Sequence, residues 1–151
     1  MKSSFNKAFE IVIGLEGNMT NDPDDPGGFT IWGLASKYNP EVHIGMTINR
    51  AKEIYYEKYW VAAGCEVAPF PLDICIFDSN VNPQDHKKWR GNSMDELMNF
   101  HPENWQEYLI LRMVRYSQCS KEKYVHGHLN RILKLYVKIK ELQNGKDMAK
   151  S

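Results

Sequence analysis

Three polar side chains near the start of the sequence have types and spacings suited to cleaving a glycosidic bond. Glu16 is followed by Asp25 after eight intervening residues, and Thr30 follows Asp25 after four more. In an inverting glycosidase, one carboxylic acid protonates the departing oxygen and a second, ionised carboxylate activates a water molecule, with the two carboxyl groups about 6.5–9.5 Å apart. Glu16 could be the acid and Asp25 the base, and the Thr30 hydroxyl could hold the water between them.

The two carboxyl groups are expected to differ in pKa, as this chemistry requires. Glu16 stands at the end of a predicted helix with an apolar face, where partial burial and the negative potential of a helix C-terminus both raise the pKa of a carboxyl group. Asp25 stands in a polar loop, where a carboxylate stays ionised. One protonated and one ionised carboxyl group are the pair that a general acid and a general base need.

An ordinary structural role is the alternative for the same residues. A glutamate at a helix end is most often an exposed surface charge, and a loop of Asp, Pro and Gly is most often a series of turns. Asp22, Asp24 and Asp25 could also bind Ca²⁺, although they lack the spacing of an EF-hand loop. Residue types and spacing alone favour the structural interpretation.

A helix, a turn-rich loop and a short β element are expected to position these side chains. The helix is capped by Ser3 or Ser4 and stops at Gly17 and Asn18, which both tolerate a left-handed C-cap. Its apolar stripe consists of Phe5, Ala8, Phe9, Val12 and Ile13. Residues 18–28 are almost all turn formers, and residues 29–34 are β-prone, which predicts one short strand or a hairpin.

Helices dominate the remainder of the sequence. They are expected at 48 to about 61 after a Thr47 cap, from Pro71 through Val81, at 94–100, from Pro102 through Met113, and at about 122–143. The apolar stripe of the last helix is predicted to be Tyr124, Leu129, Ile132, Leu133, Tyr136 and Val137. The predicted fold class is therefore mainly α (α+β), a helical single domain over residues 1–151 with a small β-hairpin after the first helix.

The segment around Glu16 resembles the signature of glycoside hydrolase family 108, which comprises phage and bacterial N-acetylmuramidases. That signature has Glu-Gly-Gly followed by Asn-Asp-Pro-x-Asp-Pro-Gly-Gly-x-Thr-x-x-Gly-Ile. The sequence has Glu-Gly-Asn at 16–18 and Asn-Asp-Pro-Asp-Asp-Pro-Gly-Gly-Phe-Thr-Ile-Trp-Gly-Leu at 21–34. The resemblance covers residues 5–82 well and the rest loosely, with a weak match at 128–131. Asn18 replaces the second glycine, and residues 83–90 depart from the family pattern.

The resemblance implies a lysozyme-like fold that hydrolyses the β-1,4 bond between N-acetylmuramic acid and N-acetylglucosamine, with Glu16 as the catalytic residue. Asp25 and Thr30 follow the Glu, Asp, Thr order of phage lysozymes, and Asp22 is the rival for the base. Residues 1–82 would form the catalytic half, and residues 83–145 a helical half that resembles the family's peptidoglycan-binding region. A non-catalytic homologue that binds peptidoglycan or assists secretion is the alternative.

Four further side chains are candidates for binding the glycan. Trp32 follows Thr30 closely, and aromatic faces pack against sugar rings. Asp78 and Asn82 lie one helical turn apart, where they are either glycan contacts or structural hydrogen-bonding groups. Asp22, in the acidic loop, is the fourth candidate.

Charge and composition limit the expected partners and location. The 151 residues include 19 basic and 19 acidic side chains, so no nucleic-acid partner is expected. We see no signal peptide and no apolar run long enough to span a membrane, which predicts synthesis in the host cytoplasm and action on the cell wall after release by a holin-type or other route. The expected partner is the peptidoglycan glycan strand, bound by a monomeric endolysin. No metal or organic cofactor is implied, and His126 and His128 would face different ways on a helix.

Overall fold

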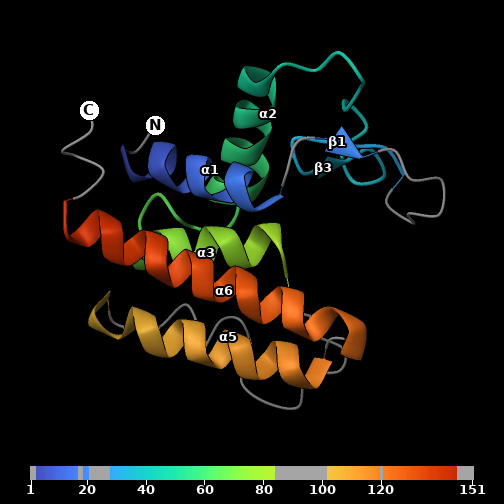
Figure 1. The fold of residues 1–151 in the computed structure, drawn as a ribbon. Coiled ribbons are helices and arrows are strands. Elements are labelled where there is room, and N and C mark those ends of the chain that lie inside the picture. Colours follow the sequence, from blue (N-terminus) through green and yellow to red (C-terminus); the bar gives the residue numbers. More distant parts are fainter. Residues whose placement is uncertain (1–2, 17–18, 21–27, 84–101, 120, 146–151) are drawn as a thin grey trace. The chain divides into compact units, whose positions relative to one another are not determined.

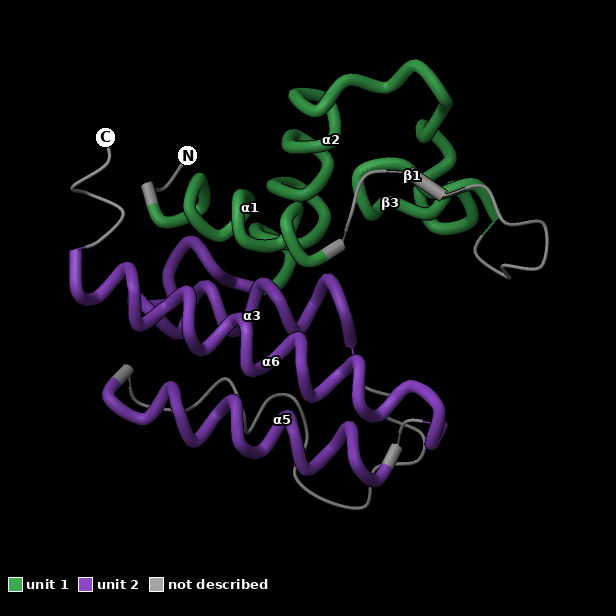
Figure 2. Tube along the Cα trace, in the orientation of Figure 1, with its two compact units in different colours: residues 1–63 green, residues 64–151 purple. Residues whose placement is uncertain are grey.

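The computed structural model of the chain describes residues 3–16, 19–20, 28–83, 102–119 and 121–145. The chain forms two compact units, residues 1–63 and residues 64–151 (Figure 2). Figure 1 shows the helices and strands of both units, with labels on most of them.

The first unit begins with helix α1 (Ser3–Glu16), whose bounds agree with the prediction. The buried members of its apolar stripe are Phe5, Ala8, Phe9 and Val12. The Phe5 ring lies edge-on to Tyr56 and Trp60, with ring centroids 5.1 and 5.3 Å apart. These aromatic contacts join α1 to the helical segment that contains both rings, and edge-to-face pairs of this kind stabilise a core beyond the area that they bury.

A small antiparallel sheet follows α1 in the sequence. Its strands β1 (Met19–Thr20), β2 (Thr30–Ile31) and β3 (Leu34–Ala35) lie in the order β1-β2-β3. The predicted hairpin is β2 with β3, and the strand β1 was not predicted. Met19 pairs with Ile31, and Ile31 pairs with Leu34. The sheet therefore brings the chain that leaves α1 directly alongside the hairpin.

The helix predicted at 48 to about 61 is present, but its second half is a π-helix. Helix α2 (Ile48–Ile54) begins at Thr47, whose side-chain hydroxyl accepts a hydrogen bond of 3.2 Å from the Arg50 backbone N–H. The π-helix η1 (Tyr55–Val61) continues from it. A π-helix has i→i+5 hydrogen bonds and often marks a functional segment. An apolar pattern of this length does not distinguish it from an α-helix.

The described regular elements of the second unit are all helical. Helix α3 (Leu72–Val81) follows Pro71, as predicted. A 3-10 turn η2 (Pro102–Asn104) leads into helix α5 (Trp105–Cys119), which is joined by a short connection to helix α6 (Glu122–Gln143). Helices α5 and α6 run antiparallel, side by side (Figure 1). The helix predicted at 94–100 lies outside the described residues.

The predicted apolar stripe of α6 is partly wrong. The structure buries Ile132, Leu135 and Ile139, which follow each other at spacings of three and four residues. The side chains of Tyr124, Leu133, Tyr136 and Val137 were predicted to face the core and are exposed. Apolar residues occur around much of the circumference of α6, so helical periodicity allows more than one buried face. The packing against the rest of the unit selects one of them.

These elements confirm the predicted fold class, a mainly α chain of the lysozyme-like kind with a small antiparallel sheet after its first helix. The single domain over residues 1–151 stays a prediction, as does its division at residues 82 and 83. Among the described helices, none is both long enough and apolar enough to cross a membrane.

Candidate functional site

Glu16 is the last residue of α1, at the helix end where the sequence predicts it. Only two residues separate it from Met19, so the Cα atoms of Glu16 and Met19 can be at most about 11 Å apart. Met19 is paired with Ile31, the neighbour of Thr30. The end of α1 and the strand that bears Thr30 therefore lie within reach of each other.

The predicted base lies on the segment that joins the two paired strands. Thr20 and Thr30 are paired in the sheet, so the segment between them leaves the sheet and returns to it at neighbouring residues. Asp22 and Asp25 belong to this segment and lie outside the described residues, as does the side chain of Glu16. The separation of the two carboxyl groups stays a prediction, and so does the choice between the two aspartates.

The turn between β2 and β3 has an unusual backbone at Trp32. The two-residue connection consists of Trp32, with φ 52°, and Gly33, with φ 77°. Two positive φ angles are typical of the type I′ turn, whose twist matches that of a two-stranded hairpin. Glycine adopts such angles freely, whereas a bulky residue rarely does. Trp32 is one of the four glycan-binding candidates, and its conformation was not predicted.

Two hydrogen bonds hold Trp32 in this conformation. Its indole Nε1 donates to the Met46 carbonyl at 2.9 Å, and the Tyr55 hydroxyl donates to the Trp32 carbonyl at 2.8 Å. Tyr55 is fully buried at the start of the π-helix. The half-buried indole, two residues after Thr30 in the chain, is thereby attached to the Met46 segment.

The segment that carries Met46 is itself attached to the π-helix. The Asn39 side-chain amide donates to the Tyr59 hydroxyl at 3.3 Å, and the Lys58 ammonium lies 3.0 Å from a carboxylate oxygen of Glu41. This ion pair is largely exposed and contributes little by itself. Together with the Tyr55 hydrogen bond, these contacts attach both the Trp32 backbone and the segment that leads to Met46 to the π-helix.

Gly28, the last residue of the Gly-Gly pair in the loop, has a structural reason to be glycine. Its φ is +72°, and a Cβ atom built on it would lie 3.0 Å from the Ser36 hydroxyl oxygen. A larger residue would therefore be strained in its backbone and crowded by its neighbour. The Ser36 backbone N–H donates to the Phe29 carbonyl at 2.8 Å, which closes the base of the hairpin at the same place.

Asp78, predicted as a glycan contact or a structural group, is buried in the second unit. Its carboxylate accepts hydrogen bonds of 2.7 Å from Arg112 and 2.7 Å from Arg131, and it has no exposed surface. Burial raises the pKa of this carboxyl group, but the two arginines outweigh burial and hold the pKa below its usual value. Both carboxylate oxygens of Asp78 accept hydrogen bonds from arginines, which favours a structural role over a contact with the glycan.

Asn82 takes part in the same cluster through its backbone. Its carbonyl accepts hydrogen bonds from Arg112, at 3.1 Å, and from the Tyr116 hydroxyl. Its backbone N–H donates to the Asp78 carbonyl at 3.0 Å, which ends α3. The structure thus brings Thr30 and Trp32 together in the first unit, while Asp78 and Asn82 join α3 to α5 and α6 in the second.

The partners of Asp78 and Trp32 were not predicted from the sequence. Arg112 lies 34 positions after Asp78, and Arg131 lies 53 positions after it. The weak family match at 128–131 includes Arg131, and it was the only available signal. Nothing in the sequence marks Tyr55 as the donor to Trp32.

The described residues contain no group of three or more His, Cys, Asp and Glu side chains placed to hold a metal ion. Cys75 is fully buried and burial raises the pKa of its thiol, so it is not an activated nucleophile.

Comparison with known proteins gives one match. A family described as Glycosyl hydrolase 108 matches residues 9–83, a segment that includes Glu16, the acidic loop, the hairpin, the π-helix and α3. No curated protein and no solved structure matches the chain.

Proposed function

This chain belongs to glycosyl hydrolase family 108, and from that membership we propose that it is a lysozyme-type muramidase. Its substrate is bacterial peptidoglycan, in which it hydrolyses the β-1,4 bond between N-acetylmuramic acid and N-acetylglucosamine. The observation that supports this proposal most directly is the position of Glu16, which ends α1 three residues before the strand paired with the hairpin.

In the proposed reaction, Glu16 is the general acid and Asp25 is the general base. The Glu16 carboxylic acid donates its proton to the glycosidic oxygen as the bond from that oxygen to the anomeric carbon breaks. Asp25 accepts a proton from a water molecule that attacks the opposite face of the same carbon, and the configuration inverts. The Thr30 hydroxyl positions the water, and Asp22 is the alternative base.

Trp32 is proposed to pack against a sugar ring next to the cleaved bond. The indole donates a hydrogen bond to Met46 and the Trp32 backbone carbonyl accepts one from Tyr55, so little conformational entropy would be lost when a sugar binds. Asp22 is a further candidate for a direct glycan contact, whereas Asp78 and Asn82 would act by holding helices together. The protein would be made in the host cytoplasm and would reach the wall as an endolysin, after release by a holin-type or other route.

Replacing Glu16 by Gln tests the assignment of the acid. Glu16→Gln keeps the size of the side chain and removes the proton donor, so kcat should fall by at least about 10²–10⁴-fold while the fold is retained. The measurement is the release of new reducing ends from purified peptidoglycan, with mass analysis of the products to identify the cleaved bond. Glu10→Gln, an exposed position on the same helix, is the matched control and should keep wild-type activity.

Wild-type turnover by Glu16→Gln would show that another group is the acid. Separate Asp25→Asn and Asp22→Asn variants identify the base. An aspartate whose replacement leaves turnover unchanged is not the general base. If the wild-type protein sediments with peptidoglycan but releases no reducing ends, the non-catalytic wall-binding alternative replaces the proposal.

A further inference from the structure

Helices α5 and α6 share an outer face on which apolar side chains are exposed. The face consists of Ile110 and Val114 on α5 and of Leu133, Tyr136 and Val137 on α6, with exposed fractions of 56, 39, 52, 37 and 45%. On each helix, two of these residues are four positions apart, so they form one stripe per helix. We call these five residues the α5/α6 face. Exposed apolar patches that extend over two elements usually mark an interaction site.

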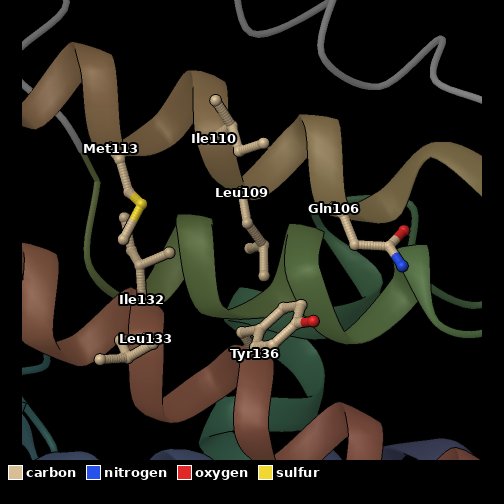
Figure 3. A pocket seen from close by; sticks show the side chains of 7 residues that line it. All are labelled: Gln106, Leu109, Ile110, Met113, Ile132, Leu133 and Tyr136. Atoms are coloured by element: carbon tan, nitrogen blue, oxygen red, sulfur yellow. The ribbon is translucent and has the colours of Figure 1, made fainter.

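A groove of about 190 Å³ runs between the two stripes (Figure 3). Met113 and Ile132 point toward each other across it, and Leu109 lies beside Tyr136. Its full lining is Gln106, Leu109, Ile110, Met113, Ile132, Leu133 and Tyr136. A groove lined by six such side chains and one amide favours an apolar occupant, because water there would find few hydrogen-bonding partners.

The charges beside the two stripes have opposite signs. On α5, the exposed Glu107 precedes Ile110 by three positions and therefore lies next to it on the helix surface. On α6, the exposed Lys134 and Lys138 directly follow Leu133 and Val137. No acidic residue occurs between Lys123 and Lys140. The face therefore has an acidic side on α5 and a basic side on α6.

We propose that a second copy of this chain docks on the α5/α6 face. A two-fold axis parallel to the helices would place α5 of each copy over α6 of the other, as in a four-helix bundle. Ile110 and Val114 of one copy would then contact the Leu133 and Val137 stripe of the second copy. The groove and both stripes would be buried together.

The positions of the charged residues along α5 and α6 support this arrangement. Leu109 faces Tyr136 and Met113 faces Ile132 on two antiparallel helices (Figure 3), so Glu107, two residues before Leu109, lies at about the level of Lys138, two residues after Tyr136. Rotation about an axis parallel to the helices keeps each residue at its level. Glu107 of one copy therefore comes beside Lys138 of the second copy at both edges of the bundle, which is the position of charged pairs at the rim of helical interfaces.

A second copy fits these charges better than an anionic lipid surface does. Lipid headgroups would attract Lys134 and Lys138 but repel Glu107, which lies on the same face. The second copy instead brings Glu107 beside Lys138, which in its own chain lies 3.4 Å from Glu141. The proposed dimer differs from the monomer expected from the sequence. Formation of the dimer does not depend on the enzymatic activity of the chain.

Sedimentation velocity of the full chain over a range of micromolar concentrations tests the proposal. The wild type should approach twice the 17.6 kDa mass of one chain as its concentration rises. Leu133→Glu puts a charge in the centre of the face and should weaken self-association at least about tenfold. Ile44→Glu is the matched control, since Ile44 is exposed in the other unit, and it should leave self-association unchanged.

A charge exchange between the helices tests the orientation of the second copy. Glu107→Lys and Lys138→Glu should each weaken the dimer, and the double variant should restore it, because the two opposite charges face each other again. A monomeric mass at every concentration, or an equal effect of Leu133→Glu and Ile44→Glu, would overturn the proposal. A monomer that sediments with anionic phospholipid vesicles would assign the face to a membrane surface instead.

Discussion

Trp32 has a backbone conformation that few bulky residues adopt, and its surroundings explain why it persists. A residue held in the left-handed region costs about 1–3 kcal/mol. The hydrogen bonds to Met46 and from Tyr55 each contribute about 0.5–1.5 kcal/mol, which is of the same size. Conformations of this kind are concentrated at functional sites. The proposed sugar contact is consistent with this tendency.

Replacing Tyr55 by Phe tests the support of Trp32. Tyr55→Phe removes the donor to the Trp32 carbonyl, and it should lower the free energy of unfolding by about 1–2 kcal/mol. If the indole contacts substrate, KM for peptidoglycan fragments should rise by up to about tenfold with a smaller change in kcat. Urea unfolding and steady-state kinetics measure the two effects.

The exposed Tyr38 provides the control for the same chemical change. Tyr38→Phe should alter neither unfolding nor KM. A Tyr55→Phe protein that is less stable but has an unchanged KM would mean that Trp32 is purely structural.

At the scale of elements, α3 is attached to α5 and α6 by a buried ionic cluster. Asp78 supplies the negative charge, and Arg112 and Arg131 supply one positive charge from each of the other two helices. A buried pair need not stabilise a fold more than well-packed apolar residues would, but removal of one partner leaves uncompensated charge. The cluster therefore specifies how the three helices meet.

Asp78→Asn is predicted to destabilise the protein strongly. The substitution leaves Arg112 without a counter-ion in a fully buried position, and the expected loss is about 3–5 kcal/mol of unfolding free energy. Denaturant titration gives the value. Glu53→Gln breaks an exposed pair with Arg50 and should change stability by less than about 1 kcal/mol. Similar losses in both variants would contradict a special role for the buried cluster.

The same cluster predicts a dependence of stability on pH. Arg112 and Arg131 hold the pKa of Asp78 below its usual value in the folded state, so the folded state binds this proton less readily than the unfolded chain does. The corresponding stability is present above the unfolded pKa of about 3.9 and is lost as pH falls below it toward the folded pKa. Unfolding free energies measured from pH 7 to the acid limit of folding should show this loss.

In Asp78→Asn the contribution of this carboxyl group is absent at every pH. The difference in stability between the wild type and the variant should therefore shrink in acid. A constant difference would mean that Asp78 does not titrate differently in the two states.

At the scale of the whole molecule, local signals predicted most of the helices. The Thr47 cap, the Pro71 start and the end of α1 at Glu16 each depend on a few neighbouring residues, and all three were found from the sequence. Capping chemistry and the restricted backbone of proline act locally, so a single sequence contains them.

Features set by contacts between distant segments were not predicted. The pairing of Met19 with Ile31 depends on how the chain returns after the acidic loop, and the buried face of α6 depends on the helices that pack against it. The partners of Asp78 come from two other helices. The family signature identified the residues of the proposed reaction, but it contains no information about the groups that hold Trp32.

The π-helix at Tyr55–Val61 accommodates an extra residue relative to an α-helix. Loss of one residue, for example the exposed Glu57, would leave a segment able to form ordinary α-helical hydrogen bonds. The side chains on either side of the deletion would then keep their faces, so Trp60 would stay beside the Phe5 ring and Tyr55 beside Trp32. Homologous sequences aligned over this segment should therefore include chains that are one residue shorter here and form a regular α-helix.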